Sequence, residues 1–206
     1  MRHLLHPLTL RIWHWINTLL IVVLLFTGGK LRVPDLHLLF DYKGAVVVHR
    51  ATGYVMAASF LFWLIYAIVS GSLAKYYTVR ARDLKGFVRQ AYYYGFGVFM
   101  GSHNPFPATS EEKFNPLQKS AYLAVQLLLT PVIVASGILF ANILRFRGAI
   151  AFIGGVRLLD AVHLVVAYVF LVYLFVHVYM ATMGKSPLTH IREMFTGWEE
   201  ESDEAH

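Results

Sequence analysis

The sequence contains no cysteine. A c-type haem is attached through cysteine side chains, and iron–sulfur clusters are held mainly by thiolates, so the chain lacks the usual attachment site for either cofactor. The same absence excludes a disulfide. If the protein handles electrons, any iron–sulfur cluster must therefore lie on another chain.

Acidic side chains are absent from the interior of four long apolar stretches, which cover roughly 10–29, 46–70, 120–142 and 160–183. Each stretch meets the requirement of about 20 residues for a helix that crosses a membrane, and the mean hydropathy of the chain is +0.55. The first is too long for the apolar region of a cleaved signal peptide. Helices this long are unusual in soluble bundles. We predict an all-α fold, an integral membrane four-helix bundle that forms one domain over 1–206.

Lys and Arg are more numerous in the termini and in the long 71–119 connection than in the two shorter loops. This bias predicts that both termini and the 71–119 loop face the cytoplasm. The net charge of +6 is then explained by membrane orientation, and we do not expect nucleic-acid binding. Within the long loop, "VRARDLKGFVRQAYYYGFG" is typical of a basic, aromatic helix at a membrane surface.

Four of the ten histidines lie inside the predicted spans. His163 and His177 are fourteen residues apart, which is about 21 Å along a helix and within about 40° of the same face. By depth, His14 pairs with His177 toward the cytoplasm, and His49 pairs with His163 toward the outside. Ionisable groups at such depths are expensive and are functional by default. Two pairs of imidazoles suit two haems b stacked across the membrane, each with axial ligands from different helices.

A metal ion bound by protein ligands alone, or a role without haem, is the alternative for these histidines. The two pairs are too far apart to share one ion, and two ligands are too few for a closed zinc site. A non-haem channel, transporter or proton relay remains an alternative, although its acidic partners are missing from the spans. Arg11, Arg50 and Lys43 lie at depths where they could meet haem propionates, or they are simply interfacial charges.

Several ordered motifs resemble the prokaryotic di-haem cytochrome b membrane subunits of formate dehydrogenases (the gamma subunit), nickel–iron hydrogenases and thiosulfate reductases. The pattern R-x-x-H-W…TG stands here as Arg11, His14, Trp15, Thr27 and Gly28. The other segments that carry the resemblance are "VVHRATGYV", "FNPLQKSAYLAVQLLLTPVIVASGILF" and "HLVVAYVFLVYLFVHVYMATMG". Together they cover nearly the whole chain.

The resemblance implies that His14 and His177 ligate a cytoplasmic-side haem b, and that His49 and His163 ligate a periplasmic-side haem b. It also implies a quinone, menaquinone or ubiquinone, bound at the cytoplasmic interface beside the inner haem. The family's quinone-site Asn matches Asn115, and Gln118 and Lys119 lie in the same motif. The alternative for Asn115-Pro116 is a helix start, with Asn as the N-cap and Pro in the first turn.

The function implied by the resemblance is electron transfer in the cytoplasmic membrane of a bacterium or archaeon. Electrons would pass between a periplasm-facing iron–sulfur subunit, attached to a catalytic subunit, and the quinone pool. No catalytic side chain is predicted on this chain. The iron–sulfur partner would dock on the outer loops, around 30–45 and 144–158. The alternative is a stand-alone four-helix cytochrome b that exchanges electrons between quinone and a small molecule such as superoxide.

Overall fold

The computed structural model describes residues 2–4, 6–37, 41–77, 81–106, 114–183 and 186–200. The acidic tail at 201–206 and parts of the 71–119 loop therefore lie outside the described residues. Four helices are long and apolar enough to cross a membrane by their length and composition: α1 (Leu8–Arg32), α2 (Tyr42–Val69), Pro116–Ala141 and α8 (Gly155–Ala181). The four long apolar helices that were predicted are confirmed, and each begins a few residues earlier than its predicted span.

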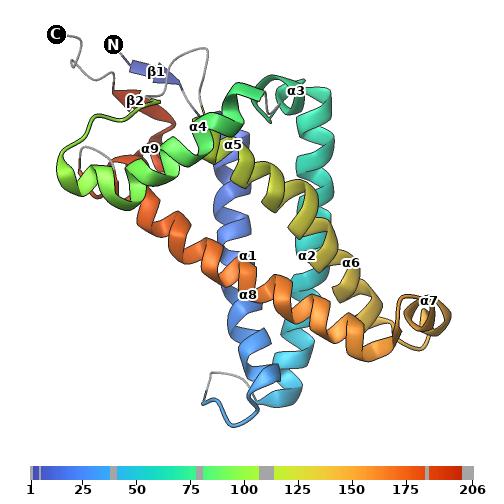
Figure 1. Ribbon diagram of the computed structural model, residues 1–206. Helices are drawn as coiled ribbons and strands as arrows, with labels where there is room; N and C mark the ends of the chain where they lie inside the picture. Colours follow the sequence, from blue (N-terminus) through green and yellow to red (C-terminus); the bar gives the residue numbers. More distant parts are fainter. Residues whose placement is uncertain are drawn as a thin grey trace. The chain divides into compact units, whose positions relative to one another are not determined.

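The chain divides into two compact units, 1–60 with 132–206 and 61–131, and each is described by itself. The first unit contains α1, the first part of α2, nearly all of α6 (Thr130–Ala141) and α8. It also contains the short helices α7 (Arg147–Phe152) and α9 (Thr189–Thr196) and the strands β1 (Arg2–Leu4) and β2 (Trp198–Glu200) (Figure 1). The second unit contains the rest of α2, α3 (Ser72–Tyr77), α4 (Ala81–Tyr92), η1 (Tyr93–Gly97), η2 (Val98–Met100), α5 (Pro116–Leu123) and η3 (Ala124–Leu129).

Polar side chains join the helices of the first unit. The indole Nε1 of Trp13 donates to the backbone oxygen of Ser59 at 3.1 Å, and the Asn17 amide donates to the Ser59 hydroxyl at 2.8 Å, so α1 is tied to α2. The Asn142 amide, just after α6, donates to the Tyr54 hydroxyl at 3.0 Å. Apolar burial gives helices little reason to associate in lipid, so polar contacts of this kind contribute to their packing.

The segments at the two ends of the described chain lie side by side. Strands β1 and β2 pair antiparallel, with Leu4 opposite Trp198, and the backbone N–H of His6 donates to the Gly197 oxygen at 3.2 Å. Gly197 has φ +86°, and a Cβ there would lie 2.8 Å from the His6 oxygen, so only glycine fits. This pairing places the two ends of the described chain next to each other, which agrees with an even number of membrane spans.

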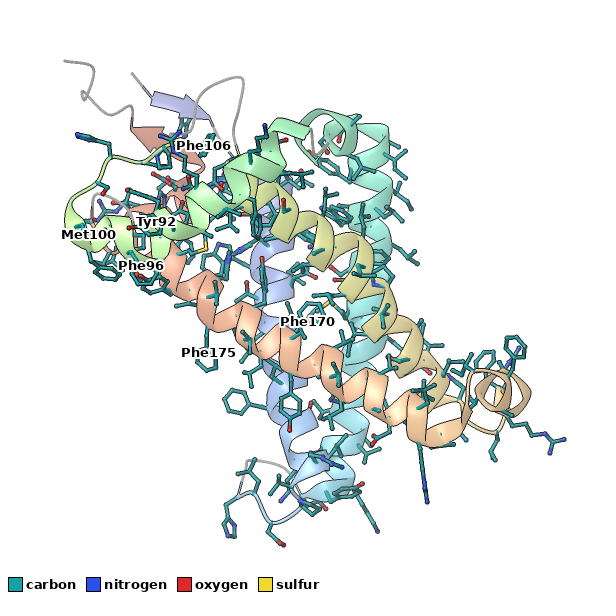
Figure 2. The ribbon with its side chains drawn as sticks, in the orientation of Figure 1. Tyr92, Phe96, Met100, Phe106, Phe170 and Phe175 are labelled. Carbon is teal, nitrogen blue, oxygen red and sulfur yellow. The ribbon has the colours of Figure 1, made fainter. Side chains whose placement is uncertain are left out.

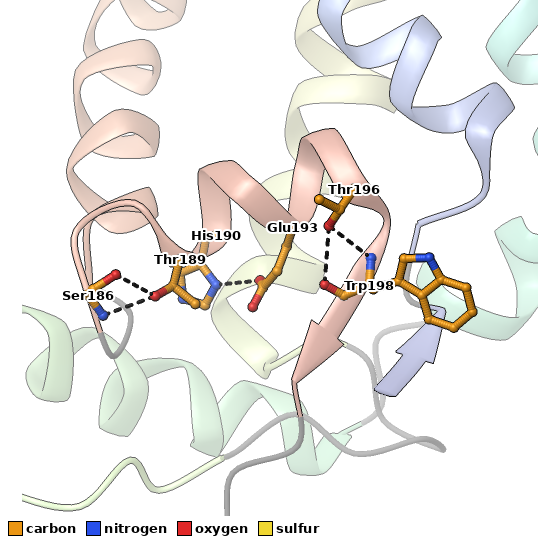
Figure 3. A network of polar contacts seen from close by, with 6 residues as sticks. All are labelled: Ser186, Thr189, His190, Glu193, Thr196 and Trp198. Carbon is orange, nitrogen blue, oxygen red and sulfur yellow. Dashed lines mark hydrogen bonds and ion pairs between the residues drawn. The ribbon is translucent and has the colours of Figure 1, made fainter. Parts of the chain in front are cut away.

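Short-range hydrogen bonds shape the segment between α8 and β2 (Figure 3). The Ser186 N–H donates to the Thr189 hydroxyl at 3.0 Å, where α9 begins. Inside α9, His190 Nδ1 lies 2.8 Å from the Glu193 carboxylate. The Thr196 hydroxyl accepts from the Trp198 N–H at 3.3 Å, where the helix ends. These bonds fix the turns that flank α9 and link two side chains within it.

The second unit is organised by the packing of α4 on α5. The inward face of α4 carries Asp83, Gly86 and Gln90, at the spacing of one helix face. A Cβ at Gly86 would lie 2.7 Å from Pro116 Cγ, so the two helices are in close contact there. The outward face of α4 carries apolar and basic side chains and ends at the exposed Tyr92, and it continues into η1 and η2, where Phe96 and Met100 are exposed (Figure 2). The structure thus has a helix where one was predicted, and its position at a membrane surface stays a prediction.

The third span contains a wide π-helical turn just before Pro131. Residues Ala124–Leu129 form a π-helix, and both the N–H and the hydroxyl of Thr130 bond to the Val125 oxygen. Pro131 has no N–H to donate and crowds the preceding turn. A local π-helical adjustment is one way in which a membrane helix accommodates this.

Candidate functional site

The four membrane histidines come from three helices and meet in two pairs. His14 of α1 faces His177 of α8, with ring centroids 6.1 Å apart. His49 of α2 faces His163 of α8, with ring centroids 6.3 Å apart. We call them the inner pair and the outer pair, after the predicted orientation. The structure therefore brings together the residues that depth alone had paired, and all four belong to the first unit.

The spacing within each pair suits a metal ion between two imidazoles. Two metal–nitrogen bonds of about 2 Å, plus about 1 Å from each nitrogen to its ring centre, place the ring centres roughly 6 Å apart. Among the residues that the structure describes, no group of three or more His, Cys, Asp or Glu side chains gathers around such a position. Two opposed imidazoles without further protein ligands are what a porphyrin iron requires, because the macrocycle supplies its other four bonds.

Each ring of the outer pair is held by a hydroxyl on a neighbouring helix. Thr27 Oγ1 of α1 lies 2.9 Å from His49 Nδ1, and Ser136 Oγ of α6 lies 2.8 Å from His163 Nδ1. Both hydroxyl residues are buried, with 2% and 4% of their surface exposed. Because these contacts engage Nδ1, they leave the Nε2 atoms available for a metal.

The inner pair is supported by aromatic rings. Trp15 presents its edge to His14 at 5.1 Å between centroids, and Tyr173 stacks on His177 at 5.6 Å. His14 Nδ1 is buried and has no hydrogen-bond partner among the described residues. An orphaned buried nitrogen of this kind is unusual, and it marks the inner pair as a place where a polar or metal-bearing group fits.

Helix α9 fixes the part of α1 that carries His14. The Trp15 indole donates to the Met194 oxygen at 3.2 Å and stacks on Phe195 at 4.4 Å. The Arg11 guanidinium donates to the Phe195 oxygen. The segment "HIREMFTGWEE" therefore has a structural role in positioning the first ligand helix.

The two arginines predicted to meet propionates are bonded to backbone oxygens. Arg11 binds Phe195, and Arg50 donates from Nη2 to the Ala141 oxygen at 3.3 Å. Each guanidinium has five N–H donors, and the buried Arg11 Nε has no partner among the described residues. Their contact with propionates stays a prediction.

The residues predicted to bind quinone lie in the second unit. Asn115 is the N-cap of α5: its side chain accepts from the Gln118 N–H at 2.9 Å, and the Gln118 side chain accepts from the Asn115 N–H at 3.1 Å. Pro116 occupies the first turn. The helix-start interpretation of Asn115 is thus confirmed, and this capping box engages part of the polar capacity of both side chains.

Further buried polar groups surround this cap. The Asn115 amide donates to the Tyr94 hydroxyl at 3.2 Å, and Lys119 Nζ lies 3.7 Å from the Asp83 carboxylate. Asp83 and Lys119 are both buried. Burial raises the pKa of Tyr94 above its ordinary value, because the phenolate would be poorly solvated there. The role of Asn115, Gln118 and Lys119 toward a quinone stays a prediction.

Comparison with known proteins gives the family. The family described as prokaryotic cytochrome b561 matches residues 5–197, nearly the whole chain. The chain belongs to the prokaryotic cytochrome b561 family. The cytochrome is also similar to "Putative cytochrome YdhU" of Escherichia coli (strain K12), with 34% identity over 196 residues, which are 94% of this chain and 73% of that protein. No solved structure matches.

Membership confirms the resemblance seen in the motifs. The chain is a multi-pass membrane cytochrome of the b type, which binds b-type haem and transfers electrons across the membrane. The paired imidazoles and the spacing within each pair fit this cofactor.

Sequence reasoning did not assign a role to the hydroxyls beside the outer pair. Thr27 appeared only as part of a family motif, and Ser136 only within an apolar span. A signal was present: each is a hydroxyl residue followed directly by glycine, in "FTGG" and "ASGI". Nothing in the sequence says which histidine lies opposite each one, because that depends on how neighbouring helices pack.

Proposed function

We propose that this cytochrome holds two haems b, one between His14 and His177 and one between His49 and His163, and that it is the quinone-reactive subunit of a respiratory oxidoreductase. The observation that carries the proposal is the pair of imidazole–imidazole distances, 6.1 and 6.3 Å, on helices that can span a membrane. The membrane is the cytoplasmic membrane of a bacterium or archaeon.

The architecture favours electron transfer over substrate chemistry. A b-type haem takes up and releases one electron, and two imidazole ligands leave no open position at its iron for a substrate. Helix α8 contributes one ligand to each pair over one uninterrupted helix. Phe170 lies midway between them, seven residues from each, and is buried, whereas Phe175 on the same helix points outward with 68% of its surface exposed (Figure 2). The chain thus supplies rigid ligands and an apolar packing between them.

Because the chain has no cysteine, an iron–sulfur cluster that exchanges electrons with it would lie on a separate partner chain, with the catalytic subunit beyond it. Its docking surface is proposed on the loops around 30–45 and 144–158, of which 38–40 lie outside the described residues. The quinone head group is proposed to bind the polar residues Asn115, Gln118 and Lys119. In support, the Lys119–Asp83 pair and the Tyr94 hydroxyl are buried in this unit, where ionisable groups are expensive to keep.

The haem assignment is tested by counting haems in histidine variants. We expect two haems per chain in the wild-type protein, and one in each of His177→Ala and His163→Ala. The remaining haem should differ between the two variants in its spectrum and midpoint potential. His103→Ala, at an exposed residue outside the four spans, is the matched control and should keep both haems. One haem per wild-type chain, or the loss of the same haem from both variants, would contradict the assignment.

The complex is tested by purification in mild detergent. We expect an iron–sulfur chain to accompany the cytochrome, and quinol analogues to reduce its haems. A cytochrome that purifies alone and exchanges electrons with both quinone and superoxide would instead support the stand-alone function.

A further inference from the structure

A hydroxyl residue and the glycine that follows it hold each histidine of the outer pair. Thr27 of α1 bonds to His49, and Ser136 of α6 bonds to His163, and the glycine that follows each hydroxyl leaves room for the same ring. The same two-residue arrangement therefore occurs twice, on different helices, against different rings. We call these the α1 clamp (Thr27-Gly28) and the α6 clamp (Ser136-Gly137).

The hydrogen bonds of the clamps determine where the imidazole proton lies. Thr27 Oγ1 also lies 2.7 Å from the Val23 oxygen, and Ser136 Oγ lies 2.8 Å from the Val132 oxygen. A hydroxyl has one proton but two lone pairs. If it donates that proton to the backbone oxygen, which can only accept, it must accept from the imidazole. Nδ1 then carries the ring proton, and Nε2 keeps a lone pair.

The glycines bring the clamping helices close to the rings. A Cβ at Gly28 would lie 3.3 Å from His49 Cε1, and one at Gly137 would lie 3.5 Å from His163 Cε1. Cε1 lies between the two ring nitrogens, so each clamp touches the ring edge next to the nitrogen that it bonds. Hydroxyl and glycine together restrict both the tautomer and the rotation of the ring.

We propose that Thr27-Gly28 and Ser136-Gly137 are positioning residues that lock His49 and His163 as Nδ1–H imidazoles and make them stronger electron donors to the outer haem iron. This inference rests on the proposed haem between His49 and His163. A hydrogen-bond acceptor on the second nitrogen increases the basicity of a metal-bound imidazole and fixes its orientation. Stronger donation favours ferric iron, so the clamps lower the midpoint potential of the outer haem.

The inner pair lacks the matching arrangement at His14. Its Nδ1 has no hydrogen-bond partner among the described residues, and the nearby Thr18 hydroxyl donates to the His14 backbone oxygen at 2.9 Å, not to the ring. The clamps therefore act on one haem, and they increase the driving force for an electron that moves from the outer haem to the inner one.

Redox titration of the purified cytochrome tests the clamps without any enzyme assay. In Thr27→Val, which keeps the side-chain shape, and in Ser136→Ala, we expect the midpoint potential of the outer haem to become more positive. We also expect its low-spin electron paramagnetic resonance signal to shift, and its haem to transfer to apo-myoglobin about tenfold faster. The inner haem should be unchanged. Thr18→Val is the matched control, and it should leave the outer haem unaffected.

Conservative variants separate the hydroxyl from simple packing. Thr27→Ser retains the hydroxyl and should restore the wild-type potential. An unchanged outer haem in Thr27→Val and Ser136→Ala would overturn the inference, as would equal shifts in Thr27→Val and Thr27→Ser. If Thr27→Val loses the outer haem altogether, retention in Thr27→Ser supports the clamp, and loss there too overturns it. Failure of the haem proposal itself would be recognised separately, because His163→Ala would then leave the haem content of the protein unchanged.

Discussion

At the scale of single residues, Asn115 has a role in the fold and a proposed role at the quinone site. It caps α5 through its oxygen and donates to Tyr94 through its amide nitrogen. Removing the cap costs about 1 kcal/mol, so Asn115→Ala alone would mix a structural effect with a functional one. Asn115→Ser separates them, because serine is also a good N-cap but has no amide.

We therefore predict that Asn115→Ser keeps both haems and the stability of α5, yet slows quinol-linked haem reduction as much as Asn115→Ala does. The measurement is stopped-flow reduction by a soluble quinol, with dithionite reduction as the control for intact haems. Wild-type quinol kinetics in Asn115→Ser would remove the amide from the quinone site.

Tyr94 gives a pH dependence whose sign follows from its burial. Its folded-state pKa is raised above 10.0, so folding favours the neutral phenol. The corresponding stability is fully present below about pH 10 and is lost as pH rises through the folded pKa. We predict that thermal stability in detergent falls more steeply above pH 10 in the wild type than in Tyr94→Phe. Parallel curves would mean that Tyr94 ionises equally in both states.

At the scale of elements, the α4–α5 contact depends on one glycine. A Cβ at Gly86 would lie 2.7 Å from Pro116 and 2.9 Å from Phe106, closer than atoms can approach without rearrangement. We predict that Gly86→Ala destabilises this packing by about 1–3 kcal/mol and that trypsin then cleaves at Lys85 and Arg89 roughly tenfold faster. Gly95→Ala is the control, since a Cβ there meets nothing within 4 Å. Equal cleavage rates in the two variants would contradict the close packing.

The helices and strands also show which parts of this fold could be predicted from the sequence. The four spans were predictable because a run of about 20 apolar residues is typical of a membrane-spanning helix. Helix α4 was predictable from its combination of basic and apolar side chains. The β1–β2 pairing was not, since its three-residue strands lie almost two hundred residues apart and carry no pattern of their own. The π-helical turn before Pro131 also lacked a signal, because proline predicts a disturbance but not its form.

Some features of the candidate site could be predicted from the sequence, and others could not. The depth of a residue along a helix follows from its position in the sequence, at a rise of about 1.5 Å per residue, so the histidine pairs could be predicted. The contacts of Thr27 and Ser136 could not, because they depend on which faces of neighbouring helices meet. The bond from Arg11 to the Phe195 oxygen could not be predicted either, because it depends on a short helix that the sequence did not predict.

At the scale of the whole molecule, the two haems proposed at the histidine pairs would define an electron path along α8 across the membrane. His163 and His177 are fourteen residues apart on one helix, which is about 21 Å of rise and most of a hydrocarbon core of about 30 Å. An electron that enters at the outer haem and leaves from the inner one therefore crosses most of the membrane. Each charge that crosses 100 mV stores about 2.3 kcal/mol, and no helix has to move.

We predict that the complete complex, reconstituted in liposomes and driven by its substrate, generates a membrane potential that a voltage-sensitive dye reports. His177→Ala, which breaks the inner pair, should abolish both the potential and quinone reduction, while the outer haem is still reduced by the partner. An uncoupler should remove the dye signal but leave wild-type turnover intact. Full quinone turnover without any potential would place the quinone on the same side as the electron donor, and the vectorial path through α8 would then be wrong.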